Sequence, residues 1–298
     1  MGINKSLLET IKKGRVLISD GAWGTLLIEQ GLQPGECPEL WNITNRQAVL
    51  SVAKSYIDAG ADLILTNSFG GSPVKLAHFG LENKAAELNK AAAEISREAA
   101  GDDHFVLGSI GPTGVILMMG EVPEEKLFEG FRLQAESLKQ GGADAVCIET
   151  MSALDEACLA VKAAKTVSGL EVVCTFTFEK TMNGEYRTMM GVSPADMVIA
   201  VKDAGATIIG ANCGNGFDQM IEIVQQIRKV DATIPVLVHA NAGKPVIVDG
   251  KTVFPETPEI MAGKIKRLAD CGANIIGGCC GTTPAHIRAL ANVLKDNT

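Results

Sequence analysis

The chain has 298 residues, of which 46% are hydrophobic and 21% charged, and its formal net charge is −8. This composition supports a sizeable core and excludes a disordered chain. The acidic balance argues against nucleic acid as a partner, because phosphate binding needs a basic face, and no apolar run is long enough to span a membrane. The N-terminal segment lacks the apolar core of a signal peptide, so we expect a cytoplasmic protein with reduced cysteines.

Eight short apolar runs along the chain predict buried β-strands. Four of them follow a helical stretch that ends in a small residue, glycine and another small residue, a pattern typical of a helix C-cap before a parallel strand. In chain order the runs are Val16–Ser19, the run in DAGADLILTNSFG, Phe105–Ser109, the run in QGGADAVCIET, Val172–Phe176, the run in DAGATIIGANCG, Val236–Ala240 and the run in DCGANIIGGCCG.

Helical sequences between these strands carry alanine and leucine on one face and charges on the other, as in KAAELNKAAAEISREAA. Eight alternating strands and helices predict an α/β fold, a (β/α)8 TIM barrel. A doubly wound open sheet is the alternative, but no G-x-G-x-x-G follows the first strand. No linker interrupts the pattern, so we expect a single domain over residues 1–298, with irregular inserts at about 31–45 and 111–123.

Polar residues stand where several predicted strands end. In a barrel of this type the carboxyl ends of the strands share one rim, and active sites lie there. We therefore expect the chemistry of the chain among the residues Asp20, Thr66, Asn67, Glu149, Asn212, Cys213, Asn241, Cys279 and Cys280.

Three cysteines at this rim indicate a metal site. Cys213 ends the sixth strand, and the Cys279–Cys280 pair ends the eighth, between glycines and just before a helix that is predicted to begin at Pro284. Three thiolates about 2.3 Å from a zinc ion leave one tetrahedral position open, as in catalytic zinc sites. The alternative is that these cysteines, like many others, are merely buried packing residues.

For the other five cysteines, packing is the preferred interpretation. Cys147 and Cys174 fall within predicted strands, and Cys158 and Cys271 fall within or at the end of predicted helices. Cys37 lies in an irregular segment, where we expect it to be exposed.

Seven segments together resemble the homocysteine S-methyltransferase family over nearly the whole chain, in particular the homocysteine-binding module of cobalamin-dependent methionine synthases. The segments are ISDGAWGT, DLILTNSFGGS, LGSIGPTG, CIETMSALDEA, GANCG, HANAGKP and GGCCGTTPAHI.

The resemblance implies a (β/α)8 barrel in which Cys213, Cys279 and Cys280 bind Zn²⁺. The zinc-bound thiol of the substrate would lose its proton and attack a methyl group, so no protein nucleophile is expected. Homocysteine is the implied substrate, and methionine biosynthesis the implied context. The residues that would bind it are Asp20, Gly21 and Glu149 at the amino group, Thr66, Asn67, Ser68 and Asn212 at the carboxylate, and Asn241, which would orient a ligand or a sulfur.

The chain departs from the family pattern at His239, which stands where the family more often has a different polar residue, and at Ala240, which replaces a proline. This departure concerns the substrate pocket and leaves the zinc ligands unchanged. The segment GEYRTMMGVSP is methionine-rich and either lines the pocket or packs.

The methyl donor is open at this stage. The chain ends soon after the eighth helix and has no D-x-H-x-x-G signature, so we expect any corrinoid to be carried by a separate protein. The alternatives are a cobalt-independent enzyme that uses S-methylmethionine or betaine, a demethylase of a corrinoid pathway that acts on another methylated substrate, and a non-catalytic module that binds thiol or zinc. A betaine donor would need an aromatic cage, to which Trp23 and Trp41 could contribute.

Overall fold

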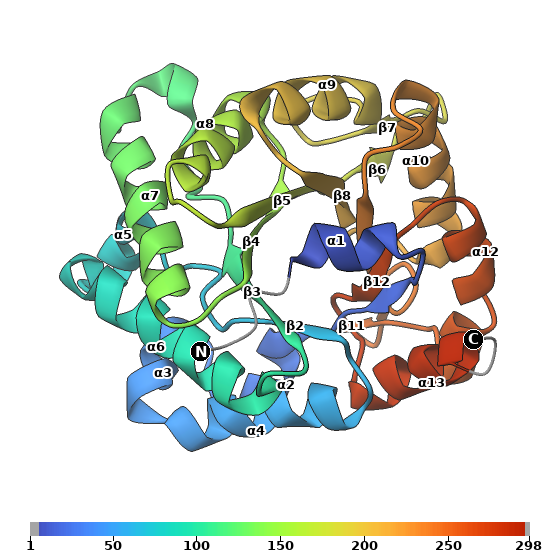
Figure 1. Cartoon of the computed structure of the whole chain (residues 1–298), viewed down its shortest axis with the longest axis horizontal. Helices are drawn as coiled ribbons and strands as arrows, with labels where there is room; N and C mark the ends of the chain where they lie inside the picture. The colour runs from blue at the N-terminus through green and yellow to red at the C-terminus, as the bar shows by residue number, and fades with distance from the viewer. Residues whose placement is uncertain (1–5, 296–298) are drawn as a thin grey trace.

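Eight parallel strands form the centre of the molecule, and helices surround them (Figure 1). The structure is a computed structural model that describes residues 6–295. All eight strands predicted from the sequence are confirmed. They are β1 (Leu17–Ile18), β2 (Leu63–Leu65), β3 (Phe105–Ile110), β4 (Ala145–Met151), β5 (Glu171–Phe176), β8 (Ile208–Asn212), β9 (Val236–Ala240) and β12 (Ile275–Gly278).

The pairing of the strands closes the sheet into a barrel. Their order is β1, β12, β9, β8, β5, β4, β3, β2, and every neighbouring pair is parallel. A single parallel bridge between Ser19 and Leu63 joins the two ends of this order. The predicted (β/α)8 TIM barrel is therefore correct.

The helices form an outer ring, and their sequences explain which face they bury. In α6, for example, Leu88, Ala92 and Ile95 recur at helical spacing and are fully buried. The helices outside the barrel are α2 (Trp23–Glu29), α3 (Trp41–Thr44), α4 (Arg46–Asp58), α5 (Pro73–Leu76), α6 (Ala85–Ala100), α7 (Glu124–Gln140), α8 (Leu154–Lys165), α9 (Pro194–Ala204), α10 (Phe217–Val230), α11 (Pro258–Ala262), α12 (Ile265–Asp270) and α13 (Pro284–Lys295). Within residues 6–295, no helix combines the length and hydropathy needed to cross a membrane.

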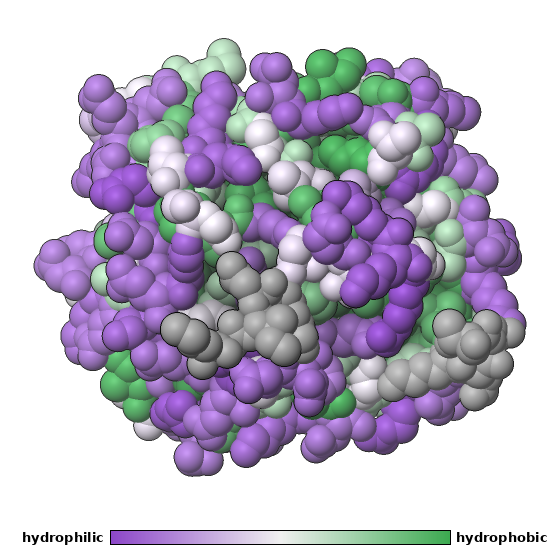
Figure 2. Space-filling model, in the orientation of Figure 1, coloured by the Kyte–Doolittle hydropathy of each residue, from purple (hydrophilic) through white to green (hydrophobic). Residues whose placement is uncertain are grey.

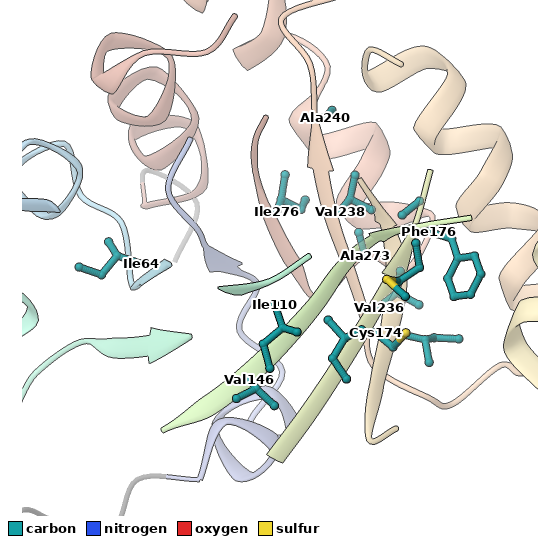
Figure 3. Close-up of a cluster of buried hydrophobic side chains, with 14 of the residues drawn as sticks. Ile64, Ile110, Val146, Cys174, Phe176, Val236, Val238, Ala240, Ala273 and Ile276 are labelled. Carbon is teal, nitrogen blue, oxygen red and sulfur yellow. The ribbon is translucent and has the colours of Figure 1, made fainter. Parts of the chain in front are cut away.

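The hydrophobic core has two layers because side chains alternate along each strand. Figure 3 shows part of the outer layer, in which strand residues such as Ile64, Val146 and Val238 pack with the helices. Cys174 belongs to this layer, which confirms its predicted packing role. The inner layer fills the barrel with residues that include Leu63, Leu107, Val173, Ile208, Leu237 and Ile275.

One end of the barrel is closed by α1 (Leu7–Lys12). Leu7 and Ile11 are buried and pack with the inner layer, and the helix lies across the strands in Figure 1. Most of the face seen in Figure 2 is hydrophilic, including the position of α1. The opposite end of the barrel, where the strands finish, is therefore the open one.

The inserts between the main elements contain more regular structure than the sequence predicted. The segment 31–45 holds a 3₁₀ turn η1 (Pro38–Leu40) and α3, and the segment 111–123 holds η4 (Leu117–Met119). Two small hairpins, β6 (Glu179–Lys180) with β7 (Tyr186–Arg187) and β10 (Val246–Val248) with β11 (Lys251–Val253), were not predicted.

The prediction that Cys37 is exposed was wrong. Its side chain is buried against Leu76, Ala85 and Leu88, because η1 and α3 fold back onto α6.

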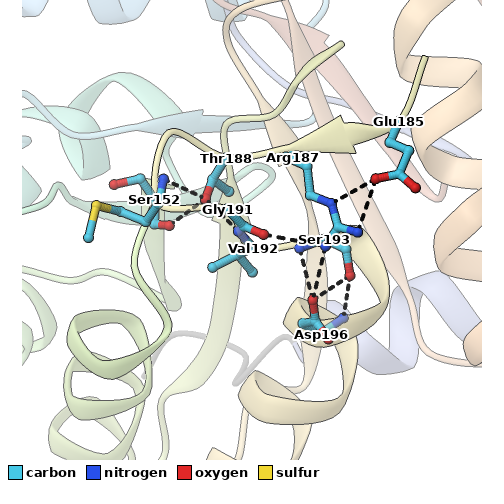
Figure 4. Close-up of polar contacts among 9 residues, drawn as sticks. Ser152, Glu185, Arg187, Thr188, Gly191, Val192, Ser193 and Asp196 are labelled. Atoms are coloured by element: carbon cyan, nitrogen blue, oxygen red, sulfur yellow. Dashed lines mark hydrogen bonds and ion pairs between the residues drawn. The ribbon is translucent and has the colours of Figure 1, made fainter. Parts of the chain in front are cut away.

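The methionine-rich segment after β7 is fixed at its two ends (Figure 4). The Thr188 hydroxyl donates to the carbonyl of Ser152 at 2.7 Å, and Ser193 and Asp196 form a capping box at the start of α9. Between them Met189 is 87% exposed, and neither Met189 nor Met190 lines the central cavity described below. The two methionines therefore neither pack into the core nor line this cavity, whereas Val192 of the same segment is buried in the core.

Candidate metal and thiol site

The barrel interior changes from apolar to polar toward the open end. Leu107, Cys147 and Leu237 belong to the buried inner layer. Two residues further along the same strands, the side chains on the same face are Ser109, Glu149 and His239. The polar residues thus face the interior at the end where active sites of this fold lie.

A cavity of about 410 Å³ opens at this end. Eight of the predicted site residues line it: Gly21, Thr66, Asn67, Ser68, Glu149, Cys213, Cys279 and Cys280. Asp20, Asn212 and Asn241 do not line it. The remaining lining residues are Ala22, Trp23, Gly24, Thr25, Leu27, Pro38, Glu39, Leu65, Phe69, Ser109, Thr150, His239 and Gly278.

Cys213, Cys279 and Cys280 converge on one wall of the cavity, as predicted from their places at two strand ends. Their sulfur atoms all lie within 4.8 Å of one another, and Cys213 Sγ is 3.8 Å from Cys280 Sγ. Two sulfur ligands 2.3 Å from a tetrahedral zinc ion would be about 3.8 Å apart. The donor set therefore fits a zinc ion bound by three thiolates, with the fourth position open.

The backbone holds the cysteines in place through β9, which lies between β8 and β12. The amide of Cys213 donates to the carbonyl of His239 at 2.9 Å, and the amide of Cys279 donates to that of Ala240 at 2.7 Å. Cys213 has a φ of +60°, a conformation that non-glycine residues seldom adopt. Such backbone strain is typical of functional sites.

The glycines around the cysteine pair make room for Thr282. A Cβ atom at Gly21 or Gly278 would lie 2.5 or 2.2 Å from Thr282 Oγ1. The same hydroxyl donates to the carbonyl of Cys279 at 2.7 Å. This packing explains the GGCCGTT sequence in physical terms, since the turn that carries both cysteines is fixed by a buried threonine between two glycines.

The three thiols are coupled to one another. Hydrogen bonds from Cys279 and Cys280 lower the pKa of the Cys213 thiol well below its ordinary value, and the Asn241 side chain contributes in the same direction. The amide oxygen of Asn241, Oδ1, is buried and has no hydrogen-bond partner among the described residues. A cluster that stabilises thiolate and leaves a buried oxygen unpaired is suited to a cation.

Opposite the thiols, the hydroxyl groups of Thr66 and Ser68, which follow β2, form a network with the backbone of Ser109 in β3. Thr66 Oγ1 and Ser68 Oγ are 2.6 Å apart, and Ser68 donates to the carbonyl of Ser109 at 2.7 Å. Ser109 in turn donates from its amide to Thr66 Oγ1 at 3.0 Å. Asn67 is held separately by the carbonyl of Pro38 at 2.7 Å. The network fixes this wall of the cavity.

Glu149 supplies a buried carboxyl group on the same side. Ser109 Oγ donates to its Oε1 at 2.5 Å, and no described residue donates to Oε2. Burial raises the pKa of Glu149 from 4.5 to about 7, against the lowering effect of the Ser109 hydrogen bond. A cation in the cavity would favour the ionised form.

Asp20 lies behind the cavity wall. It is fully buried, and its Oδ2 accepts hydrogen bonds from Trp23 Nε1 at 2.7 Å and from the amide of Leu65 at 2.8 Å. The hydroxyl of Ser19 donates to Oδ1 at 3.2 Å. Both carboxyl oxygens are therefore engaged by the protein, and Asp20 positions the Trp23 indole and the end of β2.

Asn212, like Asp20, supports the cavity wall without lining the cavity. Its Oδ1 accepts from the amide of Thr150 at 2.8 Å and from the hydroxyl of Thr175 at 2.7 Å, and its Nδ2 donates to Thr150 Oγ1 at 2.7 Å. These bonds tie β8 to β4 and β5 immediately before Cys213.

Sequence reasoning did not name several residues that line the cavity. Ser109 falls on the interior face of β3, so strand alternation could have identified it. Phe69 comes from a loop and Glu39 from η1, and neither gave a signal in the sequence. Of the two tryptophans, Trp23 lines the cavity, whereas Trp41 is packed in the core.

Comparison with known sequences assigns the family. A sequence model of the homocysteine S-methyltransferase family matches residues 17–294, which is nearly the whole barrel. The chain belongs to the homocysteine S-methyltransferase family. The resemblance seen in the seven segments is thereby confirmed.

Two curated relatives of this homocysteine S-methyltransferase family member are methionine synthases of mycobacteria. The chain is 33% identical to the Mycobacterium leprae protein and 31% identical to the Mycobacterium tuberculosis protein, in both cases over 96% of its own length. It spans about a quarter of the length of these relatives, 25% in each case.

Among solved structures, the metallated form of the homocysteine methyltransferase MmuM from Escherichia coli is similar to this family member. The TM-score is 0.78 at 24% identity, and the match covers 96% of this chain and 99% of that one. At this identity the likeness supports the barrel fold alone.

Proposed function

We propose that the chain is a zinc-dependent methyltransferase that methylates the thiol of homocysteine, with a separate corrinoid protein as the methyl donor. The observation that carries this proposal is the convergence of three thiols on one wall of a cavity whose other wall holds a buried carboxyl group. A small amino-acid thiol has the matching groups, a sulfur at one end and an ammonium at the other.

Cys213, Cys279 and Cys280 would hold the zinc ion. Bound there, zinc would supply the Lewis acidity that makes a thiol lose its proton at neutral pH. The protein does not need a nucleophile of its own, because the substrate sulfur carries the attacking electron pair. The unpaired amide oxygen of Asn241 offers a further donor beside the sulfurs before substrate arrives.

The opposite wall would hold the amino-acid end of the substrate. Glu149, with Oε2 unengaged, would pair with the ammonium group, and the Thr66–Ser68 segment and Ser109 would frame the carboxylate. Asp20 and Asn212 would act indirectly, by fixing Trp23 and the strand end before Cys213. Together these residues would set the distance between the sulfur and the ammonium group, and so the length of the accepted thiol.

The aromatic lining bears on the donor. Trp23 and Phe69 are the aromatic residues that line the cavity, and Phe69 is 41% exposed at its edge. A betaine donor is best held by an enclosing aromatic cage, which favours a corrinoid donor here. The methionine synthase relatives support the same choice.

Incubation of the zinc-loaded protein with homocysteine and each of three labelled donors tests the proposal. Methylcobalamin, S-methylmethionine and betaine are the donors, and the labelled product is methionine. We expect transfer from methylcobalamin. Transfer only from S-methylmethionine or betaine would replace the donor assignment, and no transfer from any donor would refute the proposed activity.

A further inference from the structure

His239 is a cavity residue with one buried ring nitrogen that has no hydrogen-bond partner among the described residues. Leu237 belongs to the inner layer of the barrel, so His239, two residues further along β9, also faces the interior. It lines the cavity and is only 2% exposed. Its Nε2 atom is buried and has no hydrogen-bond partner among the described residues.

The strand register places His239 beneath the thiol cluster. On β9, His239 is in register with Asn212 of β8 and with Gly277 of β12, and Cys213 and Cys279 follow these partners by one and two residues. A Cβ atom at Gly277 would lie 3.0 Å from His239 Cδ2. The ring thus occupies space that a glycine leaves free at the floor of the sulfur site.

A histidine with a purely structural role in this chain has different surroundings. His286 is also buried, but its Nδ1 accepts from the amide of Thr283 at 3.1 Å, and its Nε2 is 3.0 Å from the carbonyl of Glu256. Both of its ring nitrogens are used. Burial of an unpaired polar group is unfavourable, so the unused nitrogen of His239 indicates a partner that enters with the ligand.

We propose that His239 is a specificity-determining residue whose imidazole N–H donates a hydrogen bond to the sulfur of the acceptor thiol. This inference rests on the proposed function, because it takes the sulfur to be held by Cys213, Cys279 and Cys280 directly above the ring. The ammonium partner Glu149 lies on β4, on the other side of the barrel. The group of the ligand nearest His239 is then the sulfur itself.

The hydrogen bond distinguishes substrate from product. A thiolate sulfur carries a negative charge and is a strong acceptor, whereas the neutral sulfur of a thioether is a weak one. His239 therefore favours binding of the thiol over binding of its methylated product. The ammonium and carboxylate contacts cannot discriminate in this way, because the thiol and its methylated product share both groups.

Calorimetric titration of zinc-loaded protein with homocysteine and with methionine tests the inference. In His239→Leu we expect homocysteine affinity to fall about tenfold, the loss of one hydrogen bond to a charged group, and methionine affinity to change less than about twofold. His239→Gln keeps an N–H donor and should restore most of the homocysteine affinity. Zinc content should be unchanged in both variants.

A second measurement needs no variant. The protein has four histidines, so a ¹⁵N-histidine label gives a simple spectrum. In this spectrum the ring resonance of His239 should shift when homocysteine is added and should not shift when methionine is added. Equal loss of affinity for both ligands, loss of zinc from His239→Leu, or an unmoved resonance would overturn the inference. Failure of the wild-type protein to bind homocysteine would instead overturn the proposed function.

Discussion

Asp20→Asn tests the assignment of Asp20 to the support of the cavity wall. An asparagine can replace this carboxyl group without loss of hydrogen bonds. Its amide oxygen can accept from Trp23 Nε1 and the Leu65 amide, as Oδ2 does now, and its NH₂ group can donate to the hydroxyl oxygen of Ser19. The substitution removes a buried charge and keeps the contacts.

The magnitude follows from the pKa of Asp20, which burial raises from 3.8 to about 7. An acid with a higher pKa in the folded state stabilises the fold at low pH, and this contribution is lost as pH rises from 3.8 through 7. Between pH 5 and pH 8 the loss corresponds to about two pKa units, which is about 3 kcal/mol in the free energy of unfolding. The free energy of unfolding of Asp20→Asn, measured relative to that of wild type, should therefore rise by about 3 kcal/mol from pH 5 to pH 8.

Urea unfolding of the metal-free, reduced protein at pH 5 and pH 8 measures this difference. The Asp20 charge also helps to raise the pKa of Glu149, so the difference between the two proteins reports the removal of the Asp20 charge together with its effect on Glu149. Asp20→Ala is the control, because it leaves the indole N–H and the Leu65 amide without a partner and should be destabilising at both pH values. A difference between Asp20→Asn and wild type that does not change with pH would refute the reasoning.

Three further predictions concern the site. Cys213→Ala should lose bound zinc by metal analysis while the barrel stays folded by circular dichroism, and retention of a full equivalent of zinc would refute the ligand assignment. Glu149→Gln should weaken homocysteine binding about tenfold or more at unchanged zinc content; unchanged affinity would reduce Glu149 to a structural role. Asn212→Ala should lower the free energy of unfolding by about 3 kcal/mol, from three lost buried hydrogen bonds, and a loss under 1 kcal/mol would contradict its bridging role.

The barrel could be predicted from the sequence because its signals are local. A parallel strand covered on both faces is a short apolar run, and each of four runs follows a glycine that ends a helix. The hairpin of Glu179–Lys180 with Tyr186–Arg187 gives no such signal, since it is only two residues long on each side. The burial of Cys37 depends on contacts with α6, about fifty residues away in sequence.

The site was predictable where it depends on strand ends and unpredictable where it depends on hydrogen-bond partners. Cys213 and Cys279 converge because the carboxyl ends of parallel strands share a rim. Asp20 ends the first strand in the same way, yet its oxygens are engaged by Trp23 and Leu65. The lack of a partner at His239 Nε2 likewise arises only in the packed barrel, where no described residue donates to it or accepts from it.

X-ray absorption at the zinc edge, with and without homocysteine, tests the central claim most directly. The zinc-loaded protein alone should show three sulfur ligands, from Cys213, Cys279 and Cys280, and one lighter donor. Addition of homocysteine should raise the sulfur count to four, whereas methionine should leave it at three. A sulfur count that homocysteine does not change would contradict the claim that this chain activates its substrate thiol at the zinc ion.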